Sequence, residues 1–162
     1  MTALVHTDRV RPEWIDYNGH LSEPYYVLVF GDATTALMER AGMDGPYRTA
    51  SGCSLYTVEA HVRYLQEIGP DADLEVRTRV LGRDAKRLRL WHELYTGGRR
   101  AATEELMCLH VGPDGTVPFP DDVAALLDGL AARTGDRDEP EHAGRSIASL
   151  RSGGTAVHRP PT

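Results

Sequence analysis

The chain has 162 residues, of which 41% are hydrophobic and 26% are charged, a composition typical of one globular domain. Its formal net charge of −6 argues against nucleic acid as the main partner, because a nucleic-acid backbone requires a basic face. A phosphorylated ligand needs only a local basic cluster and stays possible. The sequence lacks a signal-peptide pattern and any apolar run of membrane-spanning length, so we expect a cytoplasmic protein without membrane contact. Cys53 and Cys108 are expected to be buried free thiols.

The first predicted elements are a strand at 3–11 and, after a turn-rich segment, one long helix. Ser22 is the expected N-cap of this helix, and Pro24 lies in its first turn, where a missing N–H costs nothing. Gly42 is the expected stop. The first half of the helix is apolar on nearly all sides, which predicts burial of most of its surface.

Four strands are predicted next, because apolar and polar residues alternate along each of them. Their expected ranges are 54–65, 73–81, 87–95 and 99–111. In the first of these strands the expected inward face comprises Tyr56, Val58, Ala60, Val62 and Tyr64. Gly97 and Gly98 predict a hairpin turn before the last strand, since both positions tolerate positive φ.

A second helix is predicted at 121–133, and the chain after it is polar. Residues 134–162 cannot bury enough apolar surface to offset ordering entropy, so we expect one domain at 1–133 and a disordered tail. This order of elements predicts an α+β fold, a five-stranded antiparallel sheet wrapped around a central helix, plus a C-terminal helix. Pairing of two copies through the second strand would remove an exposed edge, which predicts a homodimer or homotetramer.

The most informative segment runs from Trp14 to Ser22 and places the carboxylate of Asp16 in a turn that leads into the long helix. A carboxylate there lies beside unpaired backbone N–H groups and the positive end of the helix dipole. Acyl transfer needs this combination, because one group must attack a carbonyl or activate water while donors hold the oxyanion. The same residue types are also common in ordinary turns and helix caps.

Over residues 3–133 the chain resembles the 4-hydroxybenzoyl-CoA thioesterase-like branch of the hotdog acyl-CoA thioesterases. The motif from Pro12 to His20 and the apolar helix from Tyr25 to Phe30 carry this resemblance. Three further segments, at 56–61, 84–88 and 102–105, resemble the small thioesterases of carnitine breakdown. The resemblance implies the hotdog fold, no cofactor, and hydrolysis of a small acyl-CoA thioester, with betainyl-CoA as candidate substrate. One departure is Ser22, where many relatives carry Asn.

The resemblance assigns the essential carboxylate to Asp16, which either attacks the thioester carbonyl or acts as general base for a water. The backbone N–H groups of Tyr25 and Tyr26 are candidate oxyanion donors, because Pro24 has none. His20 either assists catalysis by orienting Asp16 or contacting the thioester, or only fixes the turn.

A cationic acyl group would bind to aromatic faces and negative charge. Trp14 and Tyr17 are the rings expected near the pocket, and Glu59 is expected to supply negative charge, with a solvated ion cluster as the alternative. The full set of expected substrate-binding residues is Trp14, Tyr17, Asn18, Tyr26, Glu59 and His61.

A basic cluster of Arg83, Lys86 and Arg87 at the turn between the third and fourth strands is predicted to bind the CoA phosphates. A solvated charged hairpin is the alternative. The histidines lack the spacing of a metal site, so no metal is predicted. Two rival functions remain open: a non-catalytic acyl-CoA-binding hotdog protein, and a hotdog enoyl-CoA hydratase or dehydratase that uses Asp16 and His20.

Overall fold

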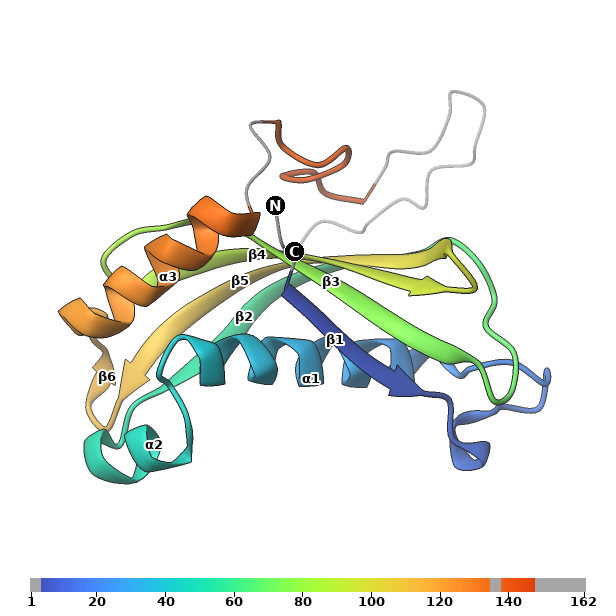
Figure 1. Cartoon of the computed structure of the whole chain (residues 1–162), viewed down its shortest axis with the longest axis horizontal. Coiled ribbons are helices and arrows are strands. Elements are labelled where there is room, and N and C mark those ends of the chain that lie inside the picture. The colour runs from blue at the N-terminus through green and yellow to red at the C-terminus, as the bar shows by residue number, and fades with distance from the viewer. Residues whose placement is uncertain (1–3, 135–137, 148–162) are drawn as a thin grey trace, which may run out of the picture.

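The computed structural model describes residues 4–134 and 138–147. An antiparallel sheet with the strand order β1-β3-β4-β5-β2 curls over the long helix α1, and the short β6 pairs with β5 (Figure 1). This arrangement confirms the expected α+β hotdog layout. The elements are β1 (Leu4–Arg9), the 3-10 helix η1 (Pro12–Trp14), α1 (Glu23–Arg40), α2 (Gly45–Ser51), β2 (Ser54–Tyr64), β3 (Asp73–Arg83), β4 (Arg87–Thr96), β5 (Arg99–Gly112), β6 (Gly115–Thr116) and α3 (Asp121–Thr134).

The side of the sheet that faces α1 forms the core. In β3 the predicted inward residues Leu74, Val76, Thr78 and Val80 are all buried, as their alternation indicated. Phe30 of α1 is fully buried among the residues of this face. The alternation therefore identified the inward face of the central strands correctly.

Two predictions about burial hold only in part. Val27 and Leu28 of α1 are 43% and 45% exposed, so the helix keeps an open apolar stripe. On β2, four of the five residues predicted to face inward are exposed, namely Tyr56, Val58, Ala60 and Tyr64, and Val62 is partly buried. The reason is that β2 is an edge strand and a bulge shifts its register between Thr57 and Glu59.

The helix α2 was absent from the sequence prediction. Asp44 caps it by accepting a hydrogen bond from the Tyr47 N–H at 2.9 Å, and Gly52 ends it with a φ of +69°. Its seven residues include Gly45 and Pro46, and so short a segment has no clear apolar period.

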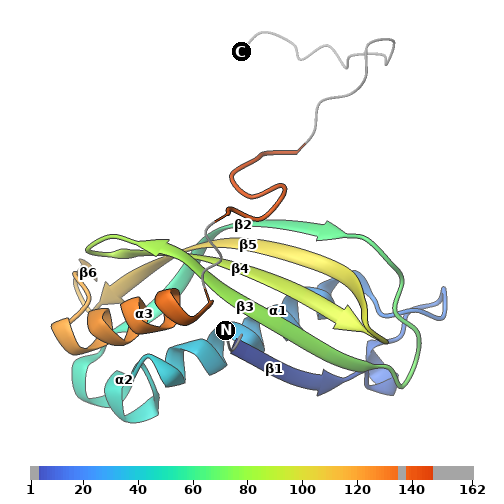
Figure 2. The ribbon, with the colours of Figure 1, turned by 45° about the horizontal axis from the view of Figure 1, so that its top comes forward.

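The helix α3 protects an edge of the sheet that β1 leaves open (Figure 2). Among the described residues the pairing of β1 with β3 ends at Leu4 and Thr78. Two residues further along β3, the Val80 N–H donates to the Thr134 hydroxyl of α3 at 3.1 Å. A helix over an unpaired strand end prevents that edge from pairing with another chain.

Part of the expected disordered tail makes contacts. In the segment 138–147, Glu139 pairs with Arg89 of β4, and the Gly144 N–H donates to the Glu105 carboxylate of β5 at 2.7 Å. For residues 148–162 and 135–137 the expectation stays a prediction, because these residues lie outside the described part of the chain.

Two buried titratable groups lie opposite each other in the β4–β5 register, His92 and Glu104. The His92 ring lies between the hydroxyls of Thr34 and Thr78, at 2.9 and 2.8 Å, and burial lowers its pKa to about 3. Glu104 is 2% exposed, and burial raises the pKa of its carboxyl to about 8. His92 is thus a neutral structural bridge, whereas Glu104 is a buried acid that keeps its proton at neutral pH.

Within the described residues, α-helices that are long and apolar enough to cross a bilayer are absent. The two cysteines are free thiols, with Cys108 buried as expected and Cys53 only partly buried. Burial raises the pKa of the Cys108 thiol to about 11, which keeps it unreactive at neutral pH.

Candidate active site

The turn that carries Asp16 is closed by its own backbone. The Asp16 N–H donates to the His20 carbonyl and the Gly19 N–H donates to the Asp16 carbonyl, both at 3.0 Å. Gly19 has a φ of +79°, a conformation that favours glycine. The Asn18 N–H donates to Oδ1 of Asp16 at 2.8 Å, which fixes the position of the carboxylate.

Two backbone bonds hold this turn against the start of α1. The Ser22 N–H donates to the Trp14 carbonyl at 2.9 Å, and the Leu21 N–H donates to the Ile68 carbonyl at 2.8 Å. Ser22 has the extended conformation of an N-cap, as predicted, although its side chain forms no capping bond. The Tyr25 N–H donates to the Ser22 carbonyl. The N–H of Glu23 has no intrahelical acceptor, because Glu23 is the first residue of the helix.

A cavity of about 750 Å³ opens beside the Asp16 turn. Three parts of the chain form its wall: the turn itself, the first residues of α1, and the end of β2 with the segment after it. The lining residues are Asp16, Asn18, His20, Leu21, Glu23, Tyr26, Tyr64, Leu65, Gln66 and Glu67. The carboxylate and the head of the long helix therefore share one cavity, as the turn pattern predicted.

The cavity is acidic. Its lining includes the carboxylates of Asp16, Glu23 and Glu67. Among the described residues its only basic side chain is His20, whose Nε2 lies 3.4 Å from the Glu67 carboxylate. Burial raises the pKa of Tyr26, and the charges of Glu67 and Asp16 add to that rise. An excess of negative charge in a partly enclosed space favours a cationic ligand.

The structure brings four of the predicted site residues to this cavity: Asp16, Asn18, His20 and Tyr26. Tyr25 lies at the same helix start, but its N–H donates a hydrogen bond to the Ser22 carbonyl. Sequence reasoning missed the remaining charged and aromatic lining residues, Glu23, Tyr64 and Glu67. Tyr64 is predicted on the inward face of a strand, and the sequence offers no signal that joins Glu67 to Asp16. Glu23 could have been found, because it follows Ser22 at the start of the helix, seven residues after Asp16.

The two rings expected near the pocket lie outside its lining. Trp14 is 3% exposed and stacks on the Tyr25 ring at 5.3 Å, with the Arg11 guanidinium 4.6 Å above it. Tyr17 is 97% exposed at the tip of the turn. In this structure Trp14 supports the start of the helix, whereas Tyr17 points into solvent.

Glu59 and His61 line a different, smaller cavity of about 270 Å³ between β2, β5 and the segment 144–146. Arg89 also lines it and is paired with Glu105 at 2.6 Å. Within one copy of the chain these two predicted residues are therefore separate from the Asp16 cavity.

The predicted CoA-binding cluster lies at the opposite end of β3 from the Asp16 turn. Arg83 is paired through two nitrogens with Asp128 of α3, and Arg87 is paired with Asp84 at 2.6 Å. The eleven residues of β3 span roughly 35 Å at about 3.3 Å per residue. One copy of the chain therefore does not bring this cluster to the Asp16 carboxylate.

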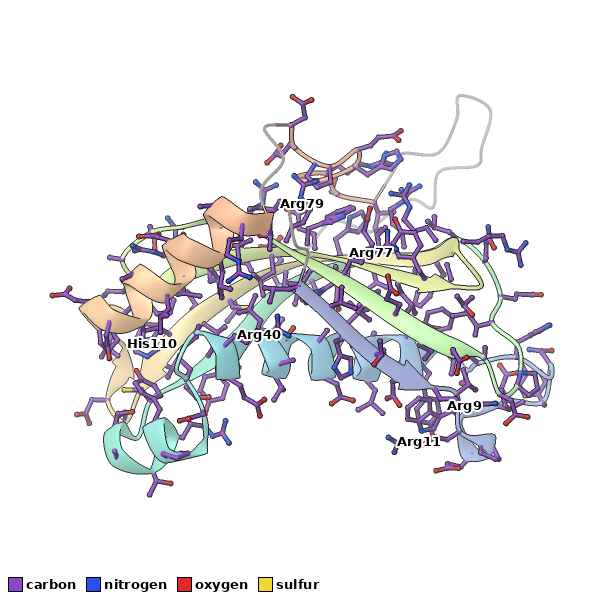
Figure 3. The ribbon with its side chains drawn as sticks, viewed as in Figure 1. Arg9, Arg11, Arg40, Arg77, Arg79 and His110 are labelled. Carbon is purple, nitrogen blue, oxygen red and sulfur yellow. The ribbon has the colours of Figure 1, made fainter. Side chains whose placement is uncertain are left out.

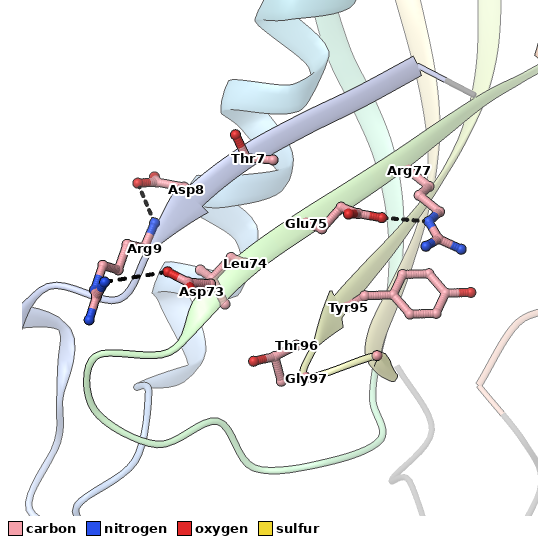
Figure 4. Close-up of a pocket in the computed structure, with 11 residues that line it drawn as sticks. Thr7, Asp8, Arg9, Asp73, Leu74, Glu75, Arg77, Tyr95, Thr96 and Gly97 are labelled. Atoms are coloured by element: carbon pink, nitrogen blue, oxygen red, sulfur yellow. Dashed lines mark hydrogen bonds and ion pairs between the residues drawn. The ribbon is translucent and has the colours of Figure 1, made fainter. Parts of the chain in front are cut away.

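A further hollow of about 610 Å³ lies where β1 ends and β3 begins (Figure 4). Each of its charged groups has an oppositely charged neighbour: Arg9 pairs with Asp73 at 3.6 Å, and Arg77 pairs with Glu75 at 2.7 Å while lying over the Tyr95 ring. The remaining carboxylate, Asp8, lies 3.9 Å from Arg11. Arg9 and Arg11 lie at this end of the molecule and His110 at the other (Figure 3). Paired charges leave this hollow without the electrostatic excess of the Asp16 cavity.

One group in the described residues brings three potential metal ligands together. The ligand atoms of His6, Asp8 and Asp32 lie within 4.8 Å of one another, between β1 and α1. Asp8 already accepts the Arg9 N–H at 2.7 Å, and none of the three lines the Asp16 cavity.

Comparison with known proteins agrees with this geometry. The family model of the thioesterase-like superfamily matches residues 10–127, a span that includes the Asp16 turn, α1 and the whole sheet after β1. The chain belongs to this superfamily. It is therefore an acyl-CoA thioesterase by family, a thioester hydrolase.

Relatives with assigned activities are similar over most of the chain. The betainyl-CoA thioesterase of Pseudomonas aeruginosa is 46% identical, with 85% of this chain and 89% of that protein covered. The L-carnitine dehydrogenase/betainyl-CoA thioesterase of Agrobacterium fabrum is 45% identical over 91% of this chain, which spans only 31% of that longer protein.

Solved structures show the same fold. A protein from Staphylococcus aureus, solved in complex with CoA, superposes with a TM-score of 0.86 at 26% identity and covers 92% of this chain and 96% of its own. A structure from Pseudomonas putida KT2440 that was assigned to the thioesterases gives a TM-score of 0.82 at 37% identity, with 93% and 99% covered.

Proposed function

We propose that this thioesterase hydrolyses betainyl-CoA to glycine betaine and CoA, with Asp16 as the catalytic carboxylate. The observation that carries the proposal is the position of Asp16 in an acidic cavity at the head of α1. A thioester carbonyl in this cavity would meet a carboxylate and a helix N-terminus together. Similarity to two proteins that bear the betainyl-CoA thioesterase name supports the acyl group.

Two chemical routes fit this position. In the first, Asp16 takes a proton from water, the hydroxide adds to the carbonyl carbon, and collapse of the oxyanion expels the CoA thiolate, which is then protonated. In the second, the carboxylate itself adds to the carbonyl and expels the thiolate, and water hydrolyses the mixed anhydride. Both routes need Asp16 ionised and held in place, and the hydrogen bond from the Asn18 N–H holds it.

The oxyanion is held at the first turn of α1 in either route. The sequence suggested the N–H of Tyr25 or Tyr26, but Tyr25 donates to Ser22 in this structure. The N–H of Glu23 heads the helix and belongs to a residue that lines the cavity, so we assign the oxyanion donor to Glu23.

The enzyme is proposed to act as a homodimer through β2. This strand is an edge of the sheet, and its exposed Tyr56 and Val58 would be covered, together with Val27 and Leu28 of α1, by a second copy. If the two β2 strands pair antiparallel about a two-fold axis, the Asp16 end of one copy lies beside the hairpin end of its partner. The partner's hairpin with Lys86 would then approach the Asp16 cavity and contribute charge to the CoA phosphates.

The proposed setting is carnitine degradation in the cytoplasm. Fusion of the relative from Agrobacterium fabrum to an L-carnitine dehydrogenase supports the pathway. Free thiols at Cys53 and Cys108 and a CoA ester as substrate support a reducing compartment.

The experiment is thiol release from a panel of acyl-CoA esters by wild-type protein and by Asp16→Asn. The substitution keeps the size of the side chain and removes its charge, so we expect kcat/KM to fall by about 100- to 10,000-fold while the ester still binds, as calorimetry would show. Asp71→Asn is the matched control, because Asp71 is exposed at the same end of the molecule and Asn tolerates its φ of 55°.

An Asp16→Asn variant that kept a tenth of wild-type turnover would remove this carboxylate from the mechanism. Wild-type protein that bound the esters without releasing thiol would favour the acyl-CoA-binding alternative, and addition of water to a crotonyl thioester would favour the hydratase.

A further inference from the structure

The corner between Tyr26 and Tyr64 is the most distinctive feature of the Asp16 cavity. The two rings are perpendicular, with an interplanar angle of 88° and centroids 5.2 Å apart. Tyr26 is buried, at 4% exposure, and its hydroxyl donates to the Gln66 carbonyl at 3.1 Å, so its ring is fixed. Tyr64 is 44% exposed at the end of β2 and forms the open side of the corner.

Negative charge surrounds this corner. The Tyr64 hydroxyl lies 3.5 Å from the Glu23 carboxylate, and Glu67 lines the same cavity. Burial raises the pKa of Tyr64, and the charge of the neighbouring Glu23 carboxylate adds to the rise. The same charges would attract a cation placed against these rings.

A quaternary ammonium group has no N–H and cannot be recognised by hydrogen bonds. It is bound instead by the faces of aromatic rings and by nearby carboxylates that need not touch it. In a betainyl thioester a single methylene separates the ammonium nitrogen from the carbonyl carbon. The cation site must therefore lie in the same cavity as the reacting carboxylate, a condition that Tyr26, Tyr64 and Asp16 meet.

We propose that Tyr26, Tyr64 and the carboxylate of Glu23 form the subsite that selects a quaternary ammonium acyl group. This inference rests on the proposed function and adds the residues that determine its specificity. Glu67 contributes less, because its carboxylate already faces His20 at 3.4 Å. Tyr26 and Tyr64 thereby take the role that the sequence assigned to Trp14 and Tyr17.

The test compares betainyl-CoA with tert-butylacetyl-CoA, in which carbon replaces the ammonium nitrogen and the shape is retained. The measured quantity is the ratio of the two kcat/KM values. Tyr64→Leu removes the ring and should lower this ratio by roughly 2- to 30-fold, the range of one cation–π contact. Tyr64→Phe keeps the ring and should keep the ratio.

Glu23→Gln tests the carboxylate without disturbing the sheet, because Glu23 is exposed at the head of α1. It should lower the ratio by about 3- to 10-fold, mainly through KM for betainyl-CoA. Glu13→Gln is the matched control, since Glu13 is exposed on η1, outside the cavity lining, and its loss changes the net charge equally.

The two proposals fail in different ways. Wild-type protein that hydrolysed both esters equally well would overturn the betainyl substrate itself. Wild-type protein that preferred betainyl-CoA, with Tyr64→Leu and Glu23→Gln retaining the full preference, would overturn only the subsite. Because Glu23→Gln alters an exposed side chain, the subsite stays testable if Tyr64→Leu fails to fold.

Discussion

The two ends of the sheet differ in how far their charged side chains are paired. At the end with the β3–β4 hairpin, Arg83 is matched by Asp128 and Arg87 by Asp84. At the end with the Asp16 turn, Asp16 and Glu23 line a cavity in which His20 is the one basic side chain from the part of the chain that the structure describes. Paired charges add little to stability and specify no ligand, whereas unmatched charge in a cavity costs energy until a ligand of opposite sign binds. We therefore propose that the acyl group binds at the unmatched end.

The largest expected effect concerns Glu104, the buried acid next to Tyr64. Its pKa is about 4.5 in the unfolded protein and about 8 in the folded protein. Below pH 4.5 the carboxyl is protonated in both states, so its titration does not change the free energy of unfolding. As pH rises from about 4.5 to 8 only the unfolded state loses the proton, and stability falls by about 5 kcal/mol in all, at 1.36 kcal/mol per pKa unit.

Glu104→Gln removes this titration. Urea unfolding at fixed protein concentration should therefore show the variant gaining stability relative to wild type between pH 5 and pH 8. Glu39→Gln, at an exposed position on α1, should follow the wild-type profile. Parallel profiles for Glu104→Gln and wild type would show that Glu104 has an ordinary pKa.

The next effect concerns the oxyanion donor. Glu23→Pro removes one N–H, and the Ser22 ψ of 144° accommodates a following proline without rebuilding the turn. On tert-butylacetyl-CoA, where the cation subsite has no role, kcat should fall by about 100- to 1,000-fold relative to Glu23→Ala, which keeps the N–H. Equal kcat values for the two variants would assign the oxyanion to another donor.

The smallest effect on activity is expected from substitutions at the β3–β4 hairpin, the end of the sheet with paired charges. Lys86 is exposed, whereas Arg83 is held by Asp128, so Lys86→Ala should raise KM for acyl-CoA by about 3-fold and Arg83→Gln should raise it less. The matching acyl-pantetheine, which lacks the nucleotide phosphates, should show no change. A rise in KM for both substrates would point to a structural effect of the hairpin instead.

Local pattern predicted most of the fold. The alternation in β3 marked the buried residues from Leu74 to Val80, and Gly97 and Gly98 marked a turn where both adopt positive φ, at 53° and 75°. The pattern failed where neighbours in space decide the outcome. Tyr56 and Val58 of β2 are exposed because the strand has a bulge and lies at the edge of the sheet. The alternation of apolar and polar residues in that segment predicts neither the bulge nor the edge position.

The site was predicted only where it is local. Asp16, Asn18, His20 and Tyr26 lie within eleven residues of one another, and a turn that runs into a helix must keep them close. Trp14 was expected to face the ligand, but stacking on Tyr25 places it in the core. Aromatic composition indicates that rings are available, whereas packing decides which of them a ligand can reach.

The sequence by itself determined the types of the elements and the placement of one carboxylate at the head of the long helix, because hydrogen bonds and side-chain periods within a segment decide both. Only the tertiary structure decided that Tyr64 and Glu67, about fifty residues after Asp16, share its cavity. Their approach follows from the strand order, which places β2 at an edge of the sheet that curls over α1. Contacts between distant segments depend on the packing of the whole sheet, which no single segment encodes.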